Sequence, residues 1–315
     1  MATETLLERL SLDLLIPVGE LLYLIRSSPM RYKVYRIRKR RPGEYRTIAQ
    51  PSPEVKALQY WVMEHLLCDC PTHPAATAYQ KGSSIRRHVS AHCHNRFLLK
   101  LDFRDFFHSI EGADFIRFFE KQARALSAGE QEALASILFW RFRGERRLVL
   151  SIGAPSSPMV SNCLLYEFDA RMGGFCEKLG VAYTRYADDL AFSSDVPNVL
   201  NLVESEVTRA CEELPFPRLR LNPEKRVYTS KKRRRYLTGL VISNEGQVSL
   251  GRPRKRLISV DVHRFLLGRL DEATARKLRG TLAFVNSVEP SFLVTLRRKY
   301  GVAAMSALGF ADLGG

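Results

Sequence analysis

The chain has 315 residues, of which 45% are hydrophobic and 26% are charged, and this composition excludes a disordered or collagen-like chain. Lysine and arginine total 49 against 33 for aspartate and glutamate, which gives a formal net charge of +16. Because such a surplus repels itself unless a polyanion neutralises it, nucleic acid is the first expected partner and an anionic membrane the second.

Three further features indicate where the protein works. Its 6 cysteines have no repeated spacing, which favours a reducing compartment over a disulfide framework. The N-terminal segment carries acidic residues early and lacks the apolar core of a signal peptide. No stretch approaches the roughly 20 apolar residues that a membrane span needs. We therefore expect a cytoplasmic protein without a membrane partner.

The first part of the chain is predicted to form helices around a basic hairpin. Leucines at helical spacing predict a helix over residues 5–26. Residues 30–50 are predicted to form a hairpin, because two runs rich in aromatic and β-branched residues flank a Pro-Gly turn. A second helix is expected over residues 53–68, with Pro53 in its first turn.

The next part combines a buried strand with several helices. The apolar run 97–103 predicts a central strand, which carries one acid, Asp102, near its end. A tight loop is expected from Gly153 to Pro158, and Ser157 is expected to cap the helix that follows. The helices expected here cover residues 113–126, 129–142 and 158–179.

The remaining residues predict a second hairpin and a helical end. Strands are expected at residues 181–185, 190–193, 218–228, 235–243 and 247–250, with a helix at 198–214. From Pro253 to about residue 308 the pattern is helical and basic. This order favours an α+β fold in which helices cover one face of a sheet, with the helical end as a separate small lobe.

Three acidic residues are not explained by packing. Asp188 and Asp189 are adjacent at the predicted hairpin tip, where they repel each other and each raises the pKa of the other. Asp102 ends a strand that is predicted to be buried, where an unpaired carboxylate is costly. If that strand pairs beside the hairpin, the three carboxylates converge and suit two Mg²⁺ ions about 4 Å apart, acting on a nucleotide triphosphate or polynucleotide. An Asx-rich turn is the alternative explanation for Asp188 and Asp189 alone.

The loop before the predicted helix at residue 158 is compatible with such a substrate. Gly153 permits a close approach of the backbone to a ligand. Ser156 and Ser157 could hydrogen-bond a phosphate at the start of the helix or cap the helix. By itself the loop is a weak indication of function.

These motifs resemble, in order and spacing, those of a reverse transcriptase. Leu101 to Phe107 (LDFRDFF) resembles the first carboxylate motif, Gly153 to Pro158 the template-loop motif, and Tyr186 to Asp189 (YADD) the signature motif of the family. The bacterial retron reverse transcriptases are the most similar group. Arg46 to Ser52 (RTIAQPS) resembles their fingers motif, and Tyr236 to Val241 (YLTGLV) resembles their V-T-G segment.

The resemblance, which covers about residues 30–300, implies a right-hand polymerase that synthesises DNA on an RNA template. The implied divisions are fingers at 1–96, a palm at 97–243 with a finger insertion at about 113–150, and a helical, RNA-binding thumb at 244–315. The resemblance also implies that Asp102, Asp188, Asp189 and the Phe103 carbonyl bind two Mg²⁺ ions, with Mn²⁺ as a possible substitute.

Individual substrate contacts are implied by the same resemblance. Lys225 matches a lysine that would protonate the leaving pyrophosphate. Arg46 would bind the incoming triphosphate, and the ring of Phe107 would act as a steric gate that excludes a ribose 2′-OH and selects dNTPs. Gly153 belongs to the template loop, and Tyr186 would help to position the primer end.

For a retron enzyme, the implied substrate is a structured noncoding RNA from the same locus. DNA synthesis would start from the 2′-OH of a guanosine in that RNA and would yield a branched product, in which single-stranded DNA is linked to RNA. Such systems are implicated in defence against phage, together with an effector protein.

Two basic runs are expected to contact phosphates of the RNA, because both lie within the large positive surplus. The expected nucleic-acid-binding residues are Lys231, Lys232, Arg233, Arg234, Arg235, Thr238, Gly239, Arg252, Arg254, Lys255 and Arg256. A solvated charged face is the alternative explanation for the two runs.

Other functions remain open at this point. The protein could be another bacterial reverse transcriptase, of the group II intron or abortive-infection type. It could also be a non-catalytic RNA-binding scaffold or a nucleotidyl cyclase. The intact set of Asp102, Asp188 and Asp189 argues against a scaffold, and Phe107 with the basic C-terminal part argues against a cyclase.

Overall fold

The computed structural model describes residues 5–39, 42–121 and 126–310. The chain begins with two helices, α1 (Leu6–Leu14) and α2 (Val18–Ser27), where the leucine pattern predicted one helix over 5–26. Leu15 ends α1 in a left-handed conformation, with φ of 54°. Pro17 has no backbone N–H with which to continue a helix. The prediction of a single helix is therefore wrong.

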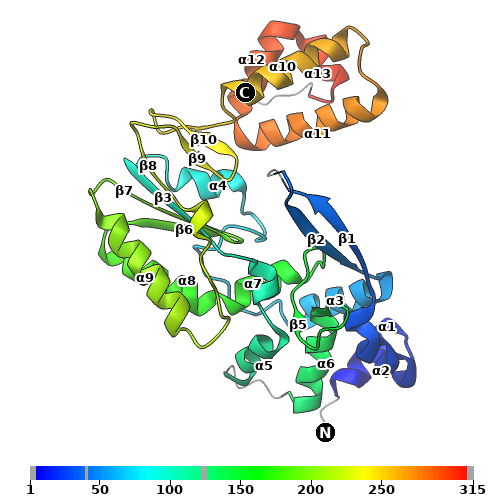
Figure 1. Cartoon of the computed structure of the whole chain (residues 1–315). Coiled ribbons are helices and arrows are strands. Elements are labelled where there is room, and N and C mark those ends of the chain that lie inside the picture. Colours follow the sequence, from blue (N-terminus) through cyan, green and yellow to red (C-terminus); the bar gives the residue numbers. More distant parts are fainter. Residues whose placement is uncertain (1–4, 40–41, 122–125, 311–315) are drawn as a thin grey trace.

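The predicted basic hairpin is present. Strands β1 (Tyr32–Arg38) and β2 (Tyr45–Pro51) pair antiparallel along their whole length. Helix α3 (Pro53–His65) follows, and the hydroxyl of Ser52 caps it by accepting a hydrogen bond from the N–H of Val55. Figure 1 shows the hairpin extending away from the N-terminal helices and in the direction of the C-terminal helices.

Four antiparallel strands form the central sheet, in the order β6-β7-β3-β8. They are β3 (Phe97–Asp102), β6 (Ala182–Tyr186), β7 (Asp189–Ser194) and β8 (Val227–Ser230). Helices α8 (Tyr166–Lys178) and α9 (Val199–Glu213) cover one face of this sheet (Figure 1). The expected α+β fold with helices on one face of a sheet is therefore confirmed.

The two faces of the sheet contribute to different cores. Leu99 and Leu101 of β3 belong to the main core with α8 and α9, whereas Leu98 belongs to a second core. Because side chains of a strand alternate between its faces, Lys100 and Asp102 lie on the same face as Leu98, opposite α8 and α9.

Several short elements connect the strands of the sheet. They are α4 (Ile85–Ser90) before β3, and α5 (Gly112–Lys121), α6 (Ala128–Leu138), β4 (Trp140–Arg141), β5 (Leu148–Val149) and α7 (Ser157–Leu164) after it. The helix predicted to end at residue 142 stops at Leu138, because Trp140 pairs with Val149 in a strand. The helix predicted over 113–126 corresponds to α5, residues 122–125 lie outside the described residues, and Leu126 is not helical.

The helix predicted over residues 158–179 is divided into α7 and α8 by Leu165, which has φ of −89° and ψ of 6°. Ser157 is the first residue of α7 and not its cap, so that prediction is wrong as well. The hydroxyls of Ser156 and Ser157 are buried and have no hydrogen-bond partner within the described residues.

The C-terminal part consists of a small sheet and a helical bundle. Its elements are β9 (Arg235–Leu237), β10 (Leu240–Ile242), β11 (Val248–Ser249), α10 (Arg252–Leu266), α11 (Glu272–Val288), α12 (Pro290–Tyr300) and α13 (Val302–Ala307). The second core joins these elements to the central sheet through Leu98 and Ala191 and to α4 through Val89. Within the described ranges, no helix is both long and apolar enough to cross a membrane.

One predicted strand is largely absent. Of residues 218–228, only Val227 and Tyr228 belong to β8, and a 3-10 helix, Pro223–Lys225, precedes them. Pro223 cannot donate to a strand ladder, and the side chain of Asn222 accepts a hydrogen bond from the N–H of Glu224 at 3.2 Å. The missing N–H of Pro223 and the hydrogen bond to the Asn222 side chain both favour the short helix.

Candidate active site

Three carboxylates meet at one end of the central sheet. The register of β3 and β7 places Asp102 directly opposite Asp189. Asp188 lies in the turn between β6 and β7, and its carbonyl accepts a 3.1 Å hydrogen bond from the N–H of Phe103. The predicted convergence of the three residues is confirmed, and it results from the pairing of strands that are distant in sequence.

Burial and mutual repulsion disfavour the charged forms of this cluster. Burial, followed by the charge of Asp102, raises the pKa of Asp188. Burial, followed by the charge of Asp188, raises the pKa of Asp189. A divalent cation would relieve this repulsion, and carboxylate oxygens are the ligands that Mg²⁺ prefers. The donor set therefore fits such an ion, although no group of three or more His, Cys, Asp or Glu side chains in the described part of the chain is arranged to hold a metal by itself.

Lys225 supplies positive charge next to the carboxylates. Its Nζ donates hydrogen bonds of 2.7 and 2.8 Å to the two carboxylate oxygens of Asp102. Burial alone would lower the pKa of Lys225, but its hydrogen bond with Asp102 and the charge of that residue outweigh burial, so the pKa is raised. The ammonium group therefore remains protonated at neutral pH and lies where it faces the acidic cluster.

Strand β2 brings a second cation to the cluster. Arg46 is exposed on β2. Burial raises the pKa of Tyr79 and of Asp188, and the charge of Arg46 opposes both changes. The positive charge of Arg46 therefore acts on both Tyr79 and Asp188.

Gly153 is exposed, and on one side it closely contacts β2. The N–H of Ala49 in β2 donates a 3.0 Å hydrogen bond to the carbonyl of Ile152. A Cβ atom at Gly153 would lie 2.9 Å from the carbonyl oxygen of Ala49. The backbone of the loop thus approaches the backbone of β2 closely at Gly153. Gly153 connects the template loop to the strand that carries Arg46.

The two phenylalanines that the sequence singled out have different environments. Phe103 is buried, and its ring centroid lies 5.7 Å from that of Phe106 and 5.4 Å from that of Phe168. Phe107 is half-buried, with its ring 5.3 Å from that of Phe106. Phe107 therefore has a surface that a nucleotide can contact, whereas Phe103 can contribute only its backbone.

The turn that carries Asp188 is strained. Ala187 has φ of 56°, in the left-handed region that residues with a side chain rarely adopt. The neighbouring Tyr186 is half-buried, and its ring lies 5.5 Å from that of His88 and 6.5 Å from that of Tyr79. Such strain persists only where the surrounding structure determines it, and it is frequent at functional sites.

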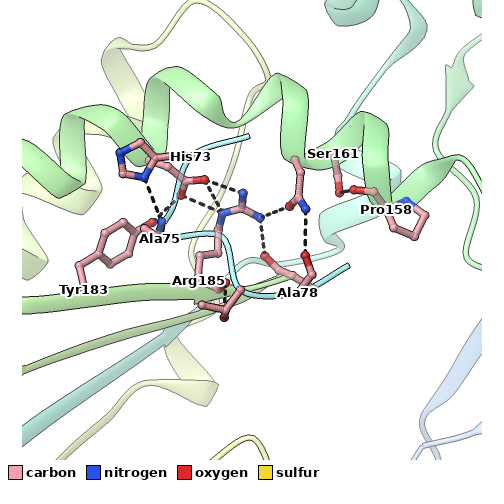
Figure 2. A network of polar contacts seen from close by, with 11 residues as sticks. His73, Ala75, Ala78, Pro158, Ser161, Tyr183 and Arg185 are labelled. Carbon is pink, nitrogen blue, oxygen red and sulfur yellow. Dashed lines mark hydrogen bonds and ion pairs between the residues drawn. The ribbon is translucent and has the colours of Figure 1, made fainter. Parts of the chain in front are cut away.

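A buried ion pair lies beneath this turn. Arg185 and Asp169 are both fully buried, and their Nη2 and Oδ2 atoms are 2.6 Å apart. Figure 2 shows the guanidinium of Arg185 at the centre of a polar network, between α8 and the loop segment near Ala75 and Ala78. The pair was not predicted from the sequence, although Arg185, a charged residue between an apolar strand and the YADD motif, could have indicated a buried ion pair.

Two histidines, His88 in α4 and His92 directly after it, contact the hairpin formed by β6 and β7. His92 is buried, and its ring nitrogens lie 2.7 Å from the hydroxyls of Ser193 and Thr184. Nδ1 of His88 also lies 2.7 Å from the Thr184 hydroxyl. Neither histidine was assigned to the site from the sequence; His88 lies in α4 and His92 in the turn directly after it.

One predicted RNA contact is corrected by the structure. Arg235 is buried, and its guanidinium donates hydrogen bonds to the carbonyls of Asn95 and Ser243, both at 2.6 Å. A side chain so engaged cannot reach a phosphate, so Arg235 has a structural role. Lys255 is also engaged, because it forms an ion pair with Glu289 at 2.5 Å.

The other predicted RNA contacts lie on the surface or in a turn. Lys231 donates a hydrogen bond of 2.8 Å to the carbonyl of His94. Thr238 and Gly239, with φ of 45° and 83°, form the turn between β9 and β10. The exposed cations of the two runs are Lys232, Arg233, Arg234, Arg252, Arg254 and Arg256.

Comparison with known proteins agrees with this geometry. The family described as reverse transcriptase (RNA-dependent DNA polymerase) matches residues 37–242. Retron Ec83 reverse transcriptase of Escherichia coli is 38% identical over 296 residues, covering 93% of this chain and 94% of the relative. Retron Ec86 reverse transcriptase of the same species is 32% identical over 298 residues, with 91% and 88% covered. Among solved structures, a foamy viral protease-reverse transcriptase in complex with double-stranded DNA has a TM-score of 0.49 at 12% identity, covering 90% of this chain and 40% of that one.

Proposed function

Because this chain belongs to the retron reverse transcriptases and is therefore an RNA-directed DNA polymerase, we propose that Asp102, Asp188 and Asp189 form its catalytic centre. The observation that carries the proposal is the register that pairs Asp102 with Asp189 while Asp188 lies in the adjoining turn. A scaffold that only bound RNA would gain nothing from three repelling carboxylates, since their repulsion costs stability.

The three carboxylates would hold the divalent ions of the reaction, Mg²⁺ or Mn²⁺, with the backbone carbonyl of Phe103 as a further ligand. Bound there, such ions would lower the pKa of the primer hydroxyl and neutralise the charge of the triphosphate. The raised pKa values of Asp188 and Asp189 support this assignment, because burial first and neighbouring carboxylates second disfavour their charged forms, which a bound cation would stabilise.

Residues around the carboxylates would bind and orient the nucleotide. Arg46 would donate charged hydrogen bonds to the triphosphate, and its effect on Asp188 supports that location. Lys225 is held protonated next to Asp102, as a group that gives a proton to pyrophosphate must be. The half-buried ring of Phe107 would exclude a ribose 2′-OH, and Tyr186 would contact the primer end.

The nucleic acid would lie between the parts of a right-hand polymerase, with fingers at 1–96, palm at 97–243 and thumb at 244–315. The turn at Thr238 and Gly239 and the exposed cations of the two basic runs would contact the phosphate backbone. Phosphate contacts supply affinity, whereas the shape of a folded RNA supplies specificity.

Membership of the retron family supports a narrower proposal for the substrate. The protein would copy a structured noncoding RNA of its own locus, start from a guanosine 2′-OH, and produce branched RNA-linked single-stranded DNA. It would work in the cytoplasm with an effector protein in defence against phage. Sequencing the nucleic acid that co-purifies with the protein tests this, and a random mixture of cellular RNA without linked DNA would argue against it.

The catalytic assignment is tested by the double variant Asp188→Asn with Asp189→Asn. Both changes keep the side-chain size but remove the charges, so DNA synthesis on a primed RNA template with dNTPs and Mg²⁺ should be lost. RNA binding, measured by fluorescence anisotropy, should remain, because the basic runs are unchanged.

Asp195→Asn is the matched control. This exposed aspartate follows the opposite end of β7, where its carboxylate accepts a hydrogen bond of 2.7 Å from the N–H of Arg96. The control should polymerise DNA at the normal rate. Undiminished synthesis by the double variant would refute the assignment of Asp188 and Asp189.

A further inference from the structure

We propose that Arg185 is a positioning residue of the polymerase reaction, which orients the turn carrying Asp188 and Asp189 by holding the carbonyl of Ala187. The proposal rests on the proposed function, because it takes those two aspartates as catalytic. It adds a residue that does not touch the substrate and acts through the backbone of the turn.

The donors of Arg185 are divided between two tasks. Its Nε and Nη2 donate to the carboxylate of Asp169 at 2.6 to 3.1 Å. Its Nη1 donates to the carbonyl of Ala187 and to Oδ1 of Asn162, both at 3.2 Å. One edge of the planar guanidinium thus neutralises the buried charge, while the remaining nitrogen reaches the catalytic turn.

The contact with Ala187 falls where the backbone is strained. Ala187 has φ of 56°, which is costly for a residue with a Cβ. Its carbonyl is held by Arg185 on one side, and the next carbonyl, of Asp188, is held by the N–H of Phe103 at 3.1 Å on the other. These two bonds fix successive peptide units, and so they fix the directions in which the Asp188 and Asp189 side chains leave the turn.

The position of Arg185 itself is determined by its surroundings. Its backbone N–H donates to the carbonyl of Ala75 and its carbonyl accepts from the N–H of Thr77, both at 2.7 Å. Asn162 of α7, which contacts the guanidinium, also donates to the carbonyl of Ala78 at 3.0 Å. The dashed contacts around Arg185 in Figure 2 show this arrangement, which joins the end of β6 to the segment near Ala75 and Ala78. A rigidly held guanidinium can transmit that rigidity to the turn.

Tyr183 provides a matched control within the same buried cluster. Its hydroxyl donates to Oδ1 of Asp169 at 2.7 Å, but it makes no contact with the turn among the described residues. Tyr183→Phe therefore weakens the ion-pair network without removing the bond to Ala187. Arg185→Lys has the opposite effect, because an ammonium can still pair with Asp169 but cannot also span the distance to Ala187 and Asn162.

The experiment measures kcat, KM for dNTP and the thermal midpoint for both variants on a primed RNA template. For Arg185→Lys we expect kcat to fall by about 10- to 100-fold, since small misplacements of reacting groups have effects of that order. Its KM should change by less than about two-fold, because nucleotide binding is not the function lost. Tyr183→Phe should lower the thermal midpoint and leave kcat unchanged. A kcat that is normal in Arg185→Lys, or that falls equally in both variants, would overturn the proposal.

A double variant separates positioning from stability in a second way. Arg185→Met with Asp169→Leu replaces the ion pair by apolar side chains of similar size, a change that buried pairs often tolerate without loss of stability. Because Asp169→Leu also removes the acceptor of the Tyr183 hydroxyl, the thermal midpoint should be no higher than that of Tyr183→Phe, while kcat remains low. Recovery of kcat together with stability would show that the pair is only structural. If the double variant does not fold, the comparison of Arg185→Lys with Tyr183→Phe still decides.

The same preparations distinguish this proposal from the proposed function. If Asp188→Asn with Asp189→Asn abolishes synthesis and Arg185→Lys does not affect it, the catalytic assignment stands and the positioning role is refuted. If the aspartate variant polymerises DNA normally, the catalytic assignment itself fails.

Discussion

Replacement of Gly153 by alanine tests how the loop before α7 supports β2, the strand that carries Arg46. Gly153 has φ of 131°, and a Cβ there would lie 2.9 Å from the carbonyl oxygen of Ala49 and 3.2 Å from Cγ2 of Ile48. Both neighbours belong to β2, the strand that carries Arg46. Because the nearest atom is backbone, the added methyl group cannot be accommodated by a side-chain rotation, and either the loop or β2 must move.

The expected loss of unfolding free energy in Gly153→Ala is the sum of two costs. A residue with a side chain in a rarely adopted backbone region costs about 1–3 kcal/mol. Overpacking against atoms that cannot rotate away costs about another 1–3 kcal/mol. We therefore expect Gly153→Ala to lower the free energy of unfolding by about 2–6 kcal/mol, a large fraction of the stability of a typical protein. Movement of β2 should also displace Arg46 and raise KM for dNTP.

Urea denaturation at equilibrium measures the first effect, and steady-state synthesis with varied dNTP measures the second. Gly174→Ala in α8 is the control, since a Cβ at this exposed helical position meets nothing within 4 Å. It should stabilise the protein by about 0.5–1 kcal/mol, because glycine is unfavourable inside a helix. An unchanged unfolding midpoint for Gly153→Ala would refute the reasoning from the contact with β2.

Substitutions at Arg235, Arg233 and His92 give three further predictions. Arg235→Gln should lower the free energy of unfolding by about 2–4 kcal/mol, because it leaves the partly buried carbonyls of Asn95 and Ser243 without their charged donor. Arg233→Gln should change stability by less than about 0.5 kcal/mol but reduce the salt dependence of RNA affinity. Equal salt slopes for Arg233→Gln and the parent protein would contradict that assignment. Burial lowers the pKa of His92 to about 3, so folded His92 stays neutral while the unfolded chain gains a proton below about pH 6.5. The stability that depends on neutral His92 is present above that pH and decreases as the pH falls, by about 2 kcal/mol at pH 5. His92→Gln should therefore flatten the dependence of unfolding free energy on pH between 7 and 5, and an identical pH profile would contradict this.

The carboxylates were accessible to sequence reasoning because their chemistry conflicts with their surroundings. An acid at the end of an apolar run and two adjacent acids at a hairpin tip are costly unless they have a function. Asp102 and the pair at 188 and 189 were then predicted to meet if the strand at 97–103 paired beside the hairpin. In the structure β3 and β7 are neighbours, and their register places Asp102 opposite Asp189.

Helix boundaries were less accessible. The leucine pattern over 5–26 and the apolar pattern over 158–179 continue through Leu15 and Leu165, where the helices end or break. Periodicity reports which face of a helix is buried, but it does not report a local change of backbone direction that preserves the buried face. Breaks of this kind depend on how each half packs against its neighbours.

By itself, the sequence determined the chemistry of this protein: the acidic cluster, the basic surplus and the order of motifs that belong to a reverse transcriptase. Only the tertiary structure decided what each cation does. Arg233 and Arg235 belong to the same basic run, yet one is exposed and the other is buried among carbonyls. Arg185 and Asp169 lie 16 residues apart and form a fully buried ion pair beneath the turn that carries Asp188. The physical reason is that charge is a property of the residue, whereas burial and hydrogen-bond partners depend on segments that meet only in the folded chain.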